Sequence, residues 1–270
     1  MSRADDFDRL RTRVRLIGRI TTLTGLRIGA SGGGGDAVDL PVMRDAQGYP
    51  FLPGASIKGV LRSTLEALVR GAGGTSREAA GATGLWSCDP FDRERGCGQH
   101  TSGQRSAQRT DDHCTICHIF GSPIVASHVR ITDAMASDRS GAVPIELRDG
   151  VSIDRDLGTV HGGQKYDFQV VSPGTAFDLE VFADNIEDWQ LGLVMLGFDQ
   201  IHQGFSGLGG FTSRGLGRVT IAWEALVAFE APQLFAAGAD IAALTAPQAL
   251  SDTQRAAWTA ALAARAGGGR

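Results

Sequence analysis

Two stretches with helical periodicity lie between stretches with strand alternation, and this order is the feature that most restricts the fold. The first run, PGASIKGVLRSTLEALVRG, repeats apolar residues every three or four positions. Ser56 is expected to cap this helix and Gly71 to end it. The second run begins after Asp184 or Asn185, uses Trp189 and apolar residues one turn apart, and ends at Gly204.

Alternating segments flank these two helical runs. Strand patterns occupy about 13–28 and 129–131, a long hairpin is expected at 145–170, and further strands are expected at 177–181 and 217–229. Strand, helix, strand, strand, helix, strand is the ferredoxin-like order, which RNA-recognition sheets also use. The sequence therefore predicts an α+β fold of this kind.

The sequence also predicts a main domain, an insertion within it and a C-terminal extension. Residues 1–230 form the predicted main domain, interrupted at 71–120 by a polar insertion that contains all four cysteines. An alanine-rich extension, 231–270, follows, with a helix expected at 252–264. The insertion has too few apolar residues to fold on its own core, so metal is the obvious candidate for ordering it.

Composition excludes two broad classes of protein. With 42% hydrophobic and 21% charged residues in 270, the chain is neither disordered nor membrane-spanning, because no apolar run approaches the roughly 18–20 residues that cross a bilayer. The N-terminal residues carry charge where a signal peptide needs an apolar run, so we expect a cytoplasmic protein. A net charge of −4 argues against chain-wide capture of nucleic acid and leaves room for a local basic groove.

Two glycine-containing segments are candidates for binding phosphate. Lys58 lies on the first turn of the first predicted helix, and Arg214 lies in the distant loop GLGGFTSRGLGRV. Backbone N–H groups, a helix dipole and two cations together suit a phosphate. Each segment alone is more often a plain turn, so only the two segments together indicate a phosphate-binding site.

The pair PFLPGASIKGVLRS and GLGGFTSRGLGRV resembles the glycine signatures of the RAMP (repeat-associated mysterious protein) superfamily of CRISPR systems. In addition, AVDLPVMRDAQGYPFLPGASIKGVLRS resembles the opening block of the backbone subunit of type III CRISPR effector complexes. The agreement continues through CTICHIFGSP, HVRITDA and the segment from DGVSIDRDLGTVHGG onward. It covers roughly residues 13–228.

This resemblance implies a modified RNA-recognition fold whose copies stack along a CRISPR RNA beside other type III subunits. Each copy would insert a thumb hairpin that kinks guide and target single-stranded RNA every six nucleotides. The residues implied in contact with guide phosphates are Ser56, Lys58, Arg62, Ser213, Arg214 and Gly215. Those implied in the thumb are Ile153, Arg155 and His161.

Three aspartates form an acidic group in GGGGDAVDLPVMRD: Asp36, Asp39 and Asp45. Carboxylates beside bound phosphates can hold Mg²⁺ or Mn²⁺ or position a 2′-hydroxyl for attack, although a loop aspartate more often only caps a turn. The resemblance implies that Asp39, just before the proline of this block, is the catalytic residue for cutting target RNA. Asp36 is a neighbour, and Asp45 suits a turn.

The four cysteines suggest a metal site. Cys114 and Cys117 form a CxxC pair with the spacing of half a zinc site, whereas the eight residues between Cys88 and Cys97 make a looser pair. Four unrelated buried thiols are the alternative. His100, His113 and His118 are possible substitute ligands. The resemblance implies that zinc in such an insertion is structural.

Two rival functions stay open at this point. A CRISPR-RNA-processing endoribonuclease of the same superfamily would use a histidine and work alone. A purely structural backbone copy would hold the RNA without cutting it, and Asp39 is the feature that argues against this reading.

Overall fold

The computed structural model describes residues 8–30, 38–92, 94, 96–98, 113–236 and 240–267. Its strands are β1 (Thr12–Thr22), β2 (Phe51–Leu52), β3 (Val129–Ile131), β4 (Ala134–Met135), β5 (Ile145–Ile153), β6 (Val160–Val171), β7 (Ala176–Asp184), β8 (Val219–Glu230) and β9 (Gln248–Ala249). Its helices are α1 (Gly54–Gly73), α2 (Arg77–Ala80), α3 (Thr115–Phe120), α4 (Asp188–His202), α5 (Ala231–Ala236), α6 (Ile241–Leu244) and α7 (Asp252–Gly267). Two 3-10 turns are η2 (Gly81–Thr83) and η4 (Thr212–Arg214).

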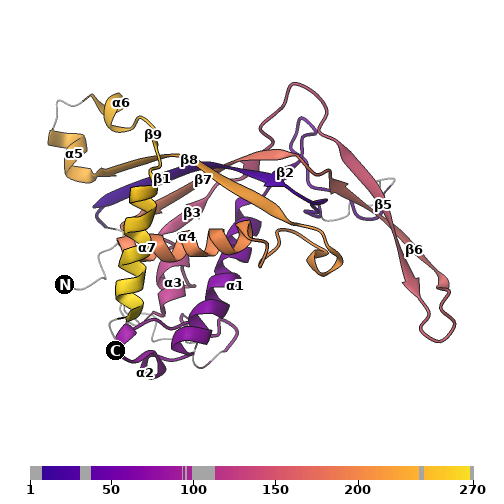
Figure 1. Ribbon diagram of the computed structural model, residues 1–270, viewed down its shortest axis with the longest axis horizontal. Helices are drawn as coiled ribbons and strands as arrows, with labels where there is room; N and C mark the ends of the chain where they lie inside the picture. Colours follow the sequence, from indigo (N-terminus) through magenta and orange to yellow (C-terminus); the bar gives the residue numbers. More distant parts are fainter. Residues whose placement is uncertain are drawn as a thin grey trace.

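The main sheet has the strand order β3-β7-β1-β8-β9, and each neighbouring pair is antiparallel. Along the chain, β1, α1, β3, β7, α4 and β8 follow one another in the predicted ferredoxin-like order. Helices α1, α3 and α4 lie on one face of this sheet (Figure 1). The mixed α/β architecture expected from the periodicities is therefore confirmed.

The core lies between the sheet and these helices. Strand β1 alternates, so Leu16 and Ile20 are fully buried against the helices, while Arg13, Arg15 and Arg19 of the same strand lie on the opposite face. Helix α1 contributes Leu61 and Leu65, and α4 contributes Phe198. Each such large apolar side chain contributes about 1.5–3 kcal/mol on burial, which makes this interface the main stabilising feature of the domain.

The first strand is shorter than its sequence pattern. It ends at Thr22, although alternation predicts a strand to about residue 28. The chain bends at 23–24 and then runs beside β6, where Leu26 pairs with Val171. Leu26 and Ile28 are thus buried beyond the end of the strand, with Leu26 at the base of the β5–β6 hairpin, whereas Leu23 is exposed.

The predicted caps of α1 are wrong by two or three residues. The helix starts at Gly54, after Pro53, because the side chain of Asp133 accepts a hydrogen bond from the Gly54 amide at 2.8 Å. This cap comes from a distant loop, which a local pattern cannot reveal. The helix continues beyond Gly71 and ends at Gly73, followed by Gly74 with a φ of 85°.

The second predicted cap is also shifted. Helix α4 starts at Asp188 with Glu187 at the N-cap, where Glu187 and Gln190 form a reciprocal capping box. Asp184 ends β7, and Asn185 adopts a left-handed φ of 53° between strand and helix. The helix ends at His202, just before Gly204, in agreement with the predicted stop.

Strands β5 and β6 form a long hairpin that projects from the body of the molecule, as the sequence predicts for 145–170 (Figure 1). The hairpin exposes several large apolar side chains: Leu147, Val151, Ile153 and Leu157. Large exposed apolar groups on a projecting hairpin favour contact with another molecule.

The C-terminal segment packs on the main domain. Strand β9 pairs with β8, and α7 lies along α4, where Trp258 is buried in the shared core. Gly192 of α4 makes this approach possible, because a side chain there would collide with the Trp258 carbonyl oxygen. The helix predicted at 252–264 is confirmed. In the part of the chain that the structure describes, no helix is long and apolar enough to cross a membrane.

Candidate functional site

Asp39 lies at the base of the hairpin, beside β6. Its Oδ2 atom accepts a hydrogen bond from the Asp167 amide at 3.0 Å. The next residue, Leu40, forms a parallel bridge with Phe168, with its amide donating to the Asp167 carbonyl oxygen and its carbonyl oxygen accepting from Gln169. Asp39 itself is exposed. Backbone pairing on both sides therefore holds an exposed carboxylate at a defined point of the hairpin.

The distant glycine loop reaches the same stretch of β6. Arg214 ends η4, is exposed, and donates a hydrogen bond to the hydroxyl of Tyr166. The Phe211 ring packs edge-on against Phe168, with ring centroids 5.1 Å apart. Residues 166–168 thus contact the Asp39 segment and the glycine loop together. Ser213 and Gly215 are exposed in this loop beside Arg214.

Two arginines flank the Phe211 ring. Arg27 lies 4.9 Å from its centroid and Arg214 lies 4.7 Å from it. Phe211 has a φ of 61°, an uncommon conformation for a large side chain. Burial lowers the pKa of Arg27, and nearby Tyr166 partly offsets this effect. The two arginines on this ring are therefore linked to the Asp39 segment through residues 166–168 of β6.

Sequence reasoning missed Arg27, Tyr166 and Phe211 as members of this site. The sequence pattern predicts that Arg27 faces solvent on a strand and that Tyr166 belongs to a polar hairpin. Only the fold shows that segments more than 180 residues apart meet at one ring. The signal that was available is the aromatic residue inside the glycine loop.

Of the other two aspartates in this acidic group, the structure describes Asp45. Asp36 lies outside the described residues. Asp45 accepts hydrogen bonds from the amides of Gln47 and Tyr49, at 3.0 and 2.9 Å, and pairs with Arg139. Asp45 is therefore a turn residue, which agrees with its sequence context.

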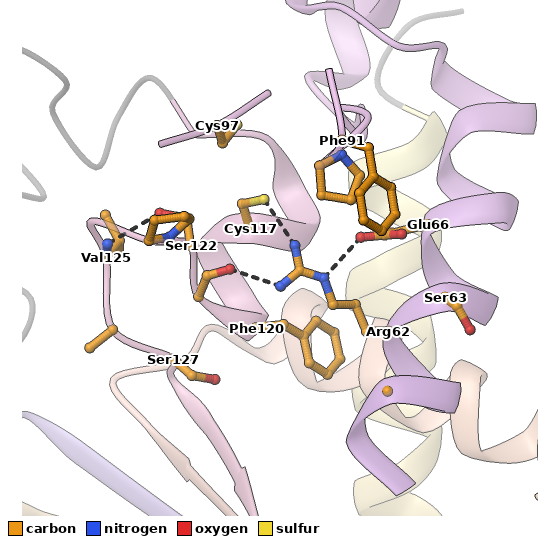
Figure 2. A pocket seen from close by; sticks show the side chains of 15 residues that line it. Arg62, Ser63, Glu66, Phe91, Cys97, Cys117, Phe120, Ser122, Val125 and Ser127 are labelled. Carbon is orange, nitrogen blue, oxygen red and sulfur yellow. Dashed lines mark hydrogen bonds and ion pairs between the residues drawn. The ribbon is translucent and has the colours of Figure 1, made fainter. Parts of the chain in front are cut away.

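The three residues of α1 that are expected to contact phosphate have different surroundings in the structure. Ser56 is exposed in the first turn, and Lys58 donates from Nζ to the Ser127 hydroxyl at 2.8 Å. Burial, and secondarily the charge of Arg62, lower the pKa of Lys58. Arg62 instead turns toward the cysteines, donating to Glu66, to the Gly121 carbonyl oxygen and to Cys117 (Figure 2). Arg62 thus already has three partners within the protein, and its expected contact with guide phosphates stays a prediction.

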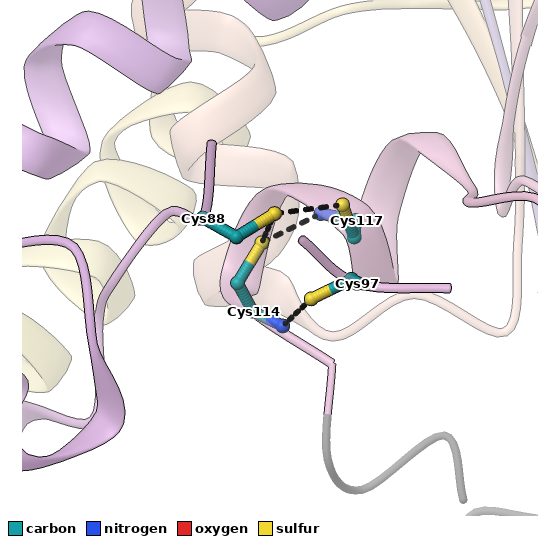
Figure 3. A group of neighbouring side chains, drawn as sticks. All are labelled: Cys88, Cys97, Cys114 and Cys117. Carbon is teal, nitrogen blue, oxygen red and sulfur yellow. Dashed lines mark hydrogen bonds between the residues drawn. The ribbon is translucent and has the colours of Figure 1, made fainter. Parts of the chain in front are cut away.

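The four cysteines form one buried cluster, with all sulfur atoms within 4.8 Å of one another (Figure 3). The Cys88 sulfur lies 3.6 Å from that of Cys117 and 3.7 Å from that of Cys114. A tetrahedral site with Zn–S bonds of about 2.3 Å places its sulfur atoms about 3.8 Å apart. Four thiolates at this spacing therefore fit a zinc ion, and Cys97 belongs to the set despite its loose sequence spacing.

Electrostatics inside the cluster also favour a cation. Hydrogen bonds from the other three thiols lower the pKa of Cys114, whereas the pKa of Cys117 is raised, first by its bond to Cys114. The bond to Cys114 raises the pKa of Cys88, but the bonds to Cys117 and Cys97 outweigh it and bring this pKa to about 7. The pKa values of Cys97 and Cys117 are thus raised beside Cys114, and a bound dication would offset this repulsion between thiolates.

The histidines considered as substitute ligands have other partners. His113 shares a hydrogen bond with the Ser122 hydroxyl at 2.8 Å. His118 bonds the side chain of Gln190 at 3.1 Å and stacks on His128. His100 lies outside the described residues. Among the described residues, the grouping of potential metal ligands consists of the four cysteines.

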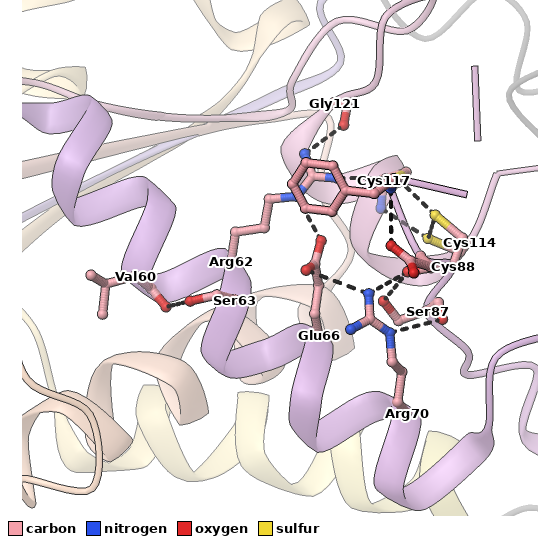
Figure 4. Close-up of polar contacts among 12 residues, drawn as sticks. Val60, Arg62, Ser63, Glu66, Arg70, Ser87, Cys88, Cys114, Cys117 and Gly121 are labelled. Atoms are coloured by element: carbon pink, nitrogen blue, oxygen red, sulfur yellow. Dashed lines mark hydrogen bonds and ion pairs between the residues drawn. The ribbon is translucent and has the colours of Figure 1, made fainter. Parts of the chain in front are cut away.

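A row of charged residues on α1 supports this cluster (Figure 4). Arg62 donates to the Cys117 sulfur at 3.2 Å and to Glu66 at 2.9 Å. Glu66, which is only 9% exposed, also pairs with Arg70, and Arg70 donates to the Cys88 carbonyl oxygen. Outer groups of this kind orient the ligands of a metal and balance thiolate charge.

Residues 19–220 match the sequence model of the RAMP superfamily, which spans most of the sheet, α1, α4, the hairpin and the glycine loop. The chain belongs to the RAMP superfamily. This confirms the resemblance inferred from the two glycine segments. The RAMP protein is also similar to a protein of Enterococcus italicus named CRISPR system Cms endoribonuclease Csm3, with 47% identity over 60 residues. That match covers 20% of this chain and 27% of the relative.

Proposed function

We propose that this RAMP protein is a backbone subunit of a type III CRISPR effector complex that binds CRISPR RNA and cleaves the target RNA paired with it. The observation that carries the proposal is the joint attachment of Asp39 and the Arg27–Phe211–Arg214 group to residues 166–168 of β6. A carboxylate beside paired arginines suits phosphoester cleavage. The similarity to a protein named as a Csm3 endoribonuclease supports the same assignment.

Guide phosphates would follow a path over the first turn of α1 and the glycine loop. The contacts would come from Ser56, Lys58, Ser213, Arg214 and Gly215, with Arg27 added from the structure. The open sheet face suits phosphates less well, because its arginines already pair with acids on neighbouring strands. These pairs are Arg13 with Asp184, Arg15 with Glu180, and Arg19 with Asp178 and Glu224. Paired charges attract polyanions weakly.

The β5–β6 hairpin would act as the thumb. Ile153 and Leu157, 64% and 75% exposed, offer an apolar wedge, and Arg155 beside them offers a cation. The described part of the hairpin includes the backbone of His161, but its side chain lies outside the description. Inserting such a wedge would unstack the bases and expose one linkage per subunit, at intervals of about six nucleotides along stacked copies.

Cleavage would use the RNA's own 2′-hydroxyl as nucleophile. Its oxygen loses its proton and forms a bond to the adjacent phosphorus, while the bond to the 5′-oxygen breaks and that oxygen takes up a proton, leaving a cyclic phosphate and a 5′-hydroxyl. Asp39 would orient the reacting hydroxyl, and Arg27 and Arg214 would hold the phosphate. The exposed Asp39 carboxylate also suits Mg²⁺ or Mn²⁺, which would neutralise charge on the phosphate.

The cysteine cluster would hold a structural zinc that orders the insertion. It is a closed four-ligand set, so it would leave no open position for substrate. We expect this subunit to work with other type III subunits and with further copies of itself in a cytoplasmic ribonucleoprotein.

One experiment separates the proposal from its rivals. Full-length protein is loaded with CRISPR RNA and offered either a paired target RNA or a repeat hairpin. Cuts in the target spaced by about six nucleotides, lost in Asp39→Ala, support the proposal. Cuts confined to the repeat hairpin would favour a processing enzyme. Tight binding without any cut would favour a purely structural subunit.

A further inference from the structure

A cleft of about 600 Å³ opens between α1, the Cys88–Cys97 loop and the segment 120–127 (Figure 2). We call it the α1 cleft, and its residues include Arg62, Phe91, Phe120, Pro123 and Ser127. Its volume falls within the roughly 300–1,000 Å³ of small-molecule sites. Phe91 lies at its rim with 89% of its surface exposed.

We propose that the α1 cleft holds one unpaired nucleobase of the bound RNA, stacked on the Phe91 ring. The inference rests on the proposed function, because it assigns a base-binding site beside the proposed phosphate path. Recognition of single-stranded RNA commonly combines a backbone-tracking cation with an aromatic side chain on which a base stacks. The cleft brings these two parts together.

The cation is supplied by Lys58, one helical turn before Arg62 on α1. Its Nζ atom bonds the hydroxyl of Ser127, which lines the α1 cleft. Along its length α1 carries three basic residues, Lys58, Arg62 and Arg70, against the single acid Glu66. The helix therefore presents a net positive charge, which suits the phosphate next to a bound base.

The polar groups of the α1 cleft are engaged within the protein. Arg62 bonds Glu66, Gly121 and Cys117, and the Ser122 hydroxyl accepts the amides of residues 124 and 125. The cleft thus offers faces for stacking and few groups for reading base edges. Binding there tolerates any base, as a subunit that accepts guides of any sequence requires.

The backbone next to Phe91 is tied to a local turn close to the cysteine cluster. The Phe91 amide donates to the Asp89 side chain at 2.9 Å, and Cys88, three residues before Phe91, belongs to the cluster. Because Cys97 and Cys117 also line the α1 cleft, the cysteine cluster holds one wall of the proposed base site.

The test compares Phe91→Ala with Phe235→Ala in the full chain. Phe235 is a matched control, since it is 87% exposed but lies on α5, away from the α1 cleft. CRISPR RNA carrying 2-aminopurine at successive positions reports stacking through its fluorescence. We expect Phe91→Ala to weaken guide affinity at least about fivefold, with an unchanged salt slope, and to remove fluorescence quenching at one position. Phe235→Ala should change neither quantity.

The outcomes separate this inference from the proposed function. Wild-type affinity and quenching in Phe91→Ala, with tight guide binding by the native chain, would overturn the base site alone. Loss of association with other subunits, at unchanged RNA affinity, would also overturn it and indicate a protein occupant. Absence of guide binding by the native chain would overturn the proposed function as well.

Discussion

Replacing Cys117 with serine removes one thiolate from the cluster and exchanges the sulfur acceptor of Arg62 for a neutral hydroxyl. Cys117 lies in the first turn of α3, with its sulfur 3.6 Å from that of Cys88 and 3.2 Å from a guanidinium nitrogen of Arg62. Serine is a poor zinc ligand at neutral pH. We therefore expect the variant to lose metal and stability together.

The magnitude follows from these two changes. Loss of even an outer partner weakens a metal site 10–100-fold, so loss of a ligand should cost at least about 100-fold, or about 2.7 kcal/mol of folding free energy. Exchanging the thiolate acceptor of Arg62 for a neutral hydroxyl costs up to about 1 kcal/mol more. The free energy of unfolding should fall by about 3–4 kcal/mol, which lowers the melting temperature by roughly 6–16 °C.

Three measurements on the same protein check this prediction. Elemental analysis of protein purified without chelator should give about one zinc per native chain and little in Cys117→Ser. A chelator should lower the melting temperature of the native chain and barely change that of the variant. Limited proteolysis should cut the variant faster within 71–120. Absence of zinc from the native chain, or equal chelator sensitivity of both proteins, would refute the reasoning.

The other predictions concern RNA binding and packing. Lys58→Ala and Arg214→Ala should each weaken guide binding without sequence preference and flatten the salt slope by about 0.7, as measured by fluorescence anisotropy. A loss confined to certain guides would argue against phosphate contacts. Gly54→Ala should lower the free energy of unfolding by about 1–3 kcal/mol in denaturant titrations, because the added Cβ would lie 2.1 Å from a carbonyl oxygen of β3. Its control, Gly59→Ala in the same helix, meets open space and should be neutral or stabilising.

The order of elements was predictable because it depends on local periodicity. Alternation in β1 and the three-to-four spacing of α1 and α4 report which residues face a core, and the structure confirms them. Cap positions were less predictable, since the Gly54 amide is satisfied by Asp133, nearly 80 residues away. A local pattern carries no information about such a partner.

The candidate site was predictable in its chemistry and less so in its geometry. The CxxC pair pointed to metal, and all four cysteines do converge. The partners of Arg62 within the protein were not predictable, because helical spacing shows that a residue lies near a glycine turn but not which neighbour its guanidinium meets. Arg27 and Phe211 meet through tertiary contacts alone, so no sequence spacing could pair them.

Cleavage by the Asp39→Ala variant tests the central claim most directly. The chain is loaded with CRISPR RNA and paired target, and single-turnover cleavage and target affinity are measured for the native protein, Asp39→Ala and the neighbouring control Asp36→Ala. The account predicts that Asp39→Ala abolishes cutting at nearly unchanged affinity, since removing a carboxylate cannot weaken anion binding by charge, and that Asp36→Ala loses much less. Cleavage by Asp39→Ala at the native rate would contradict it.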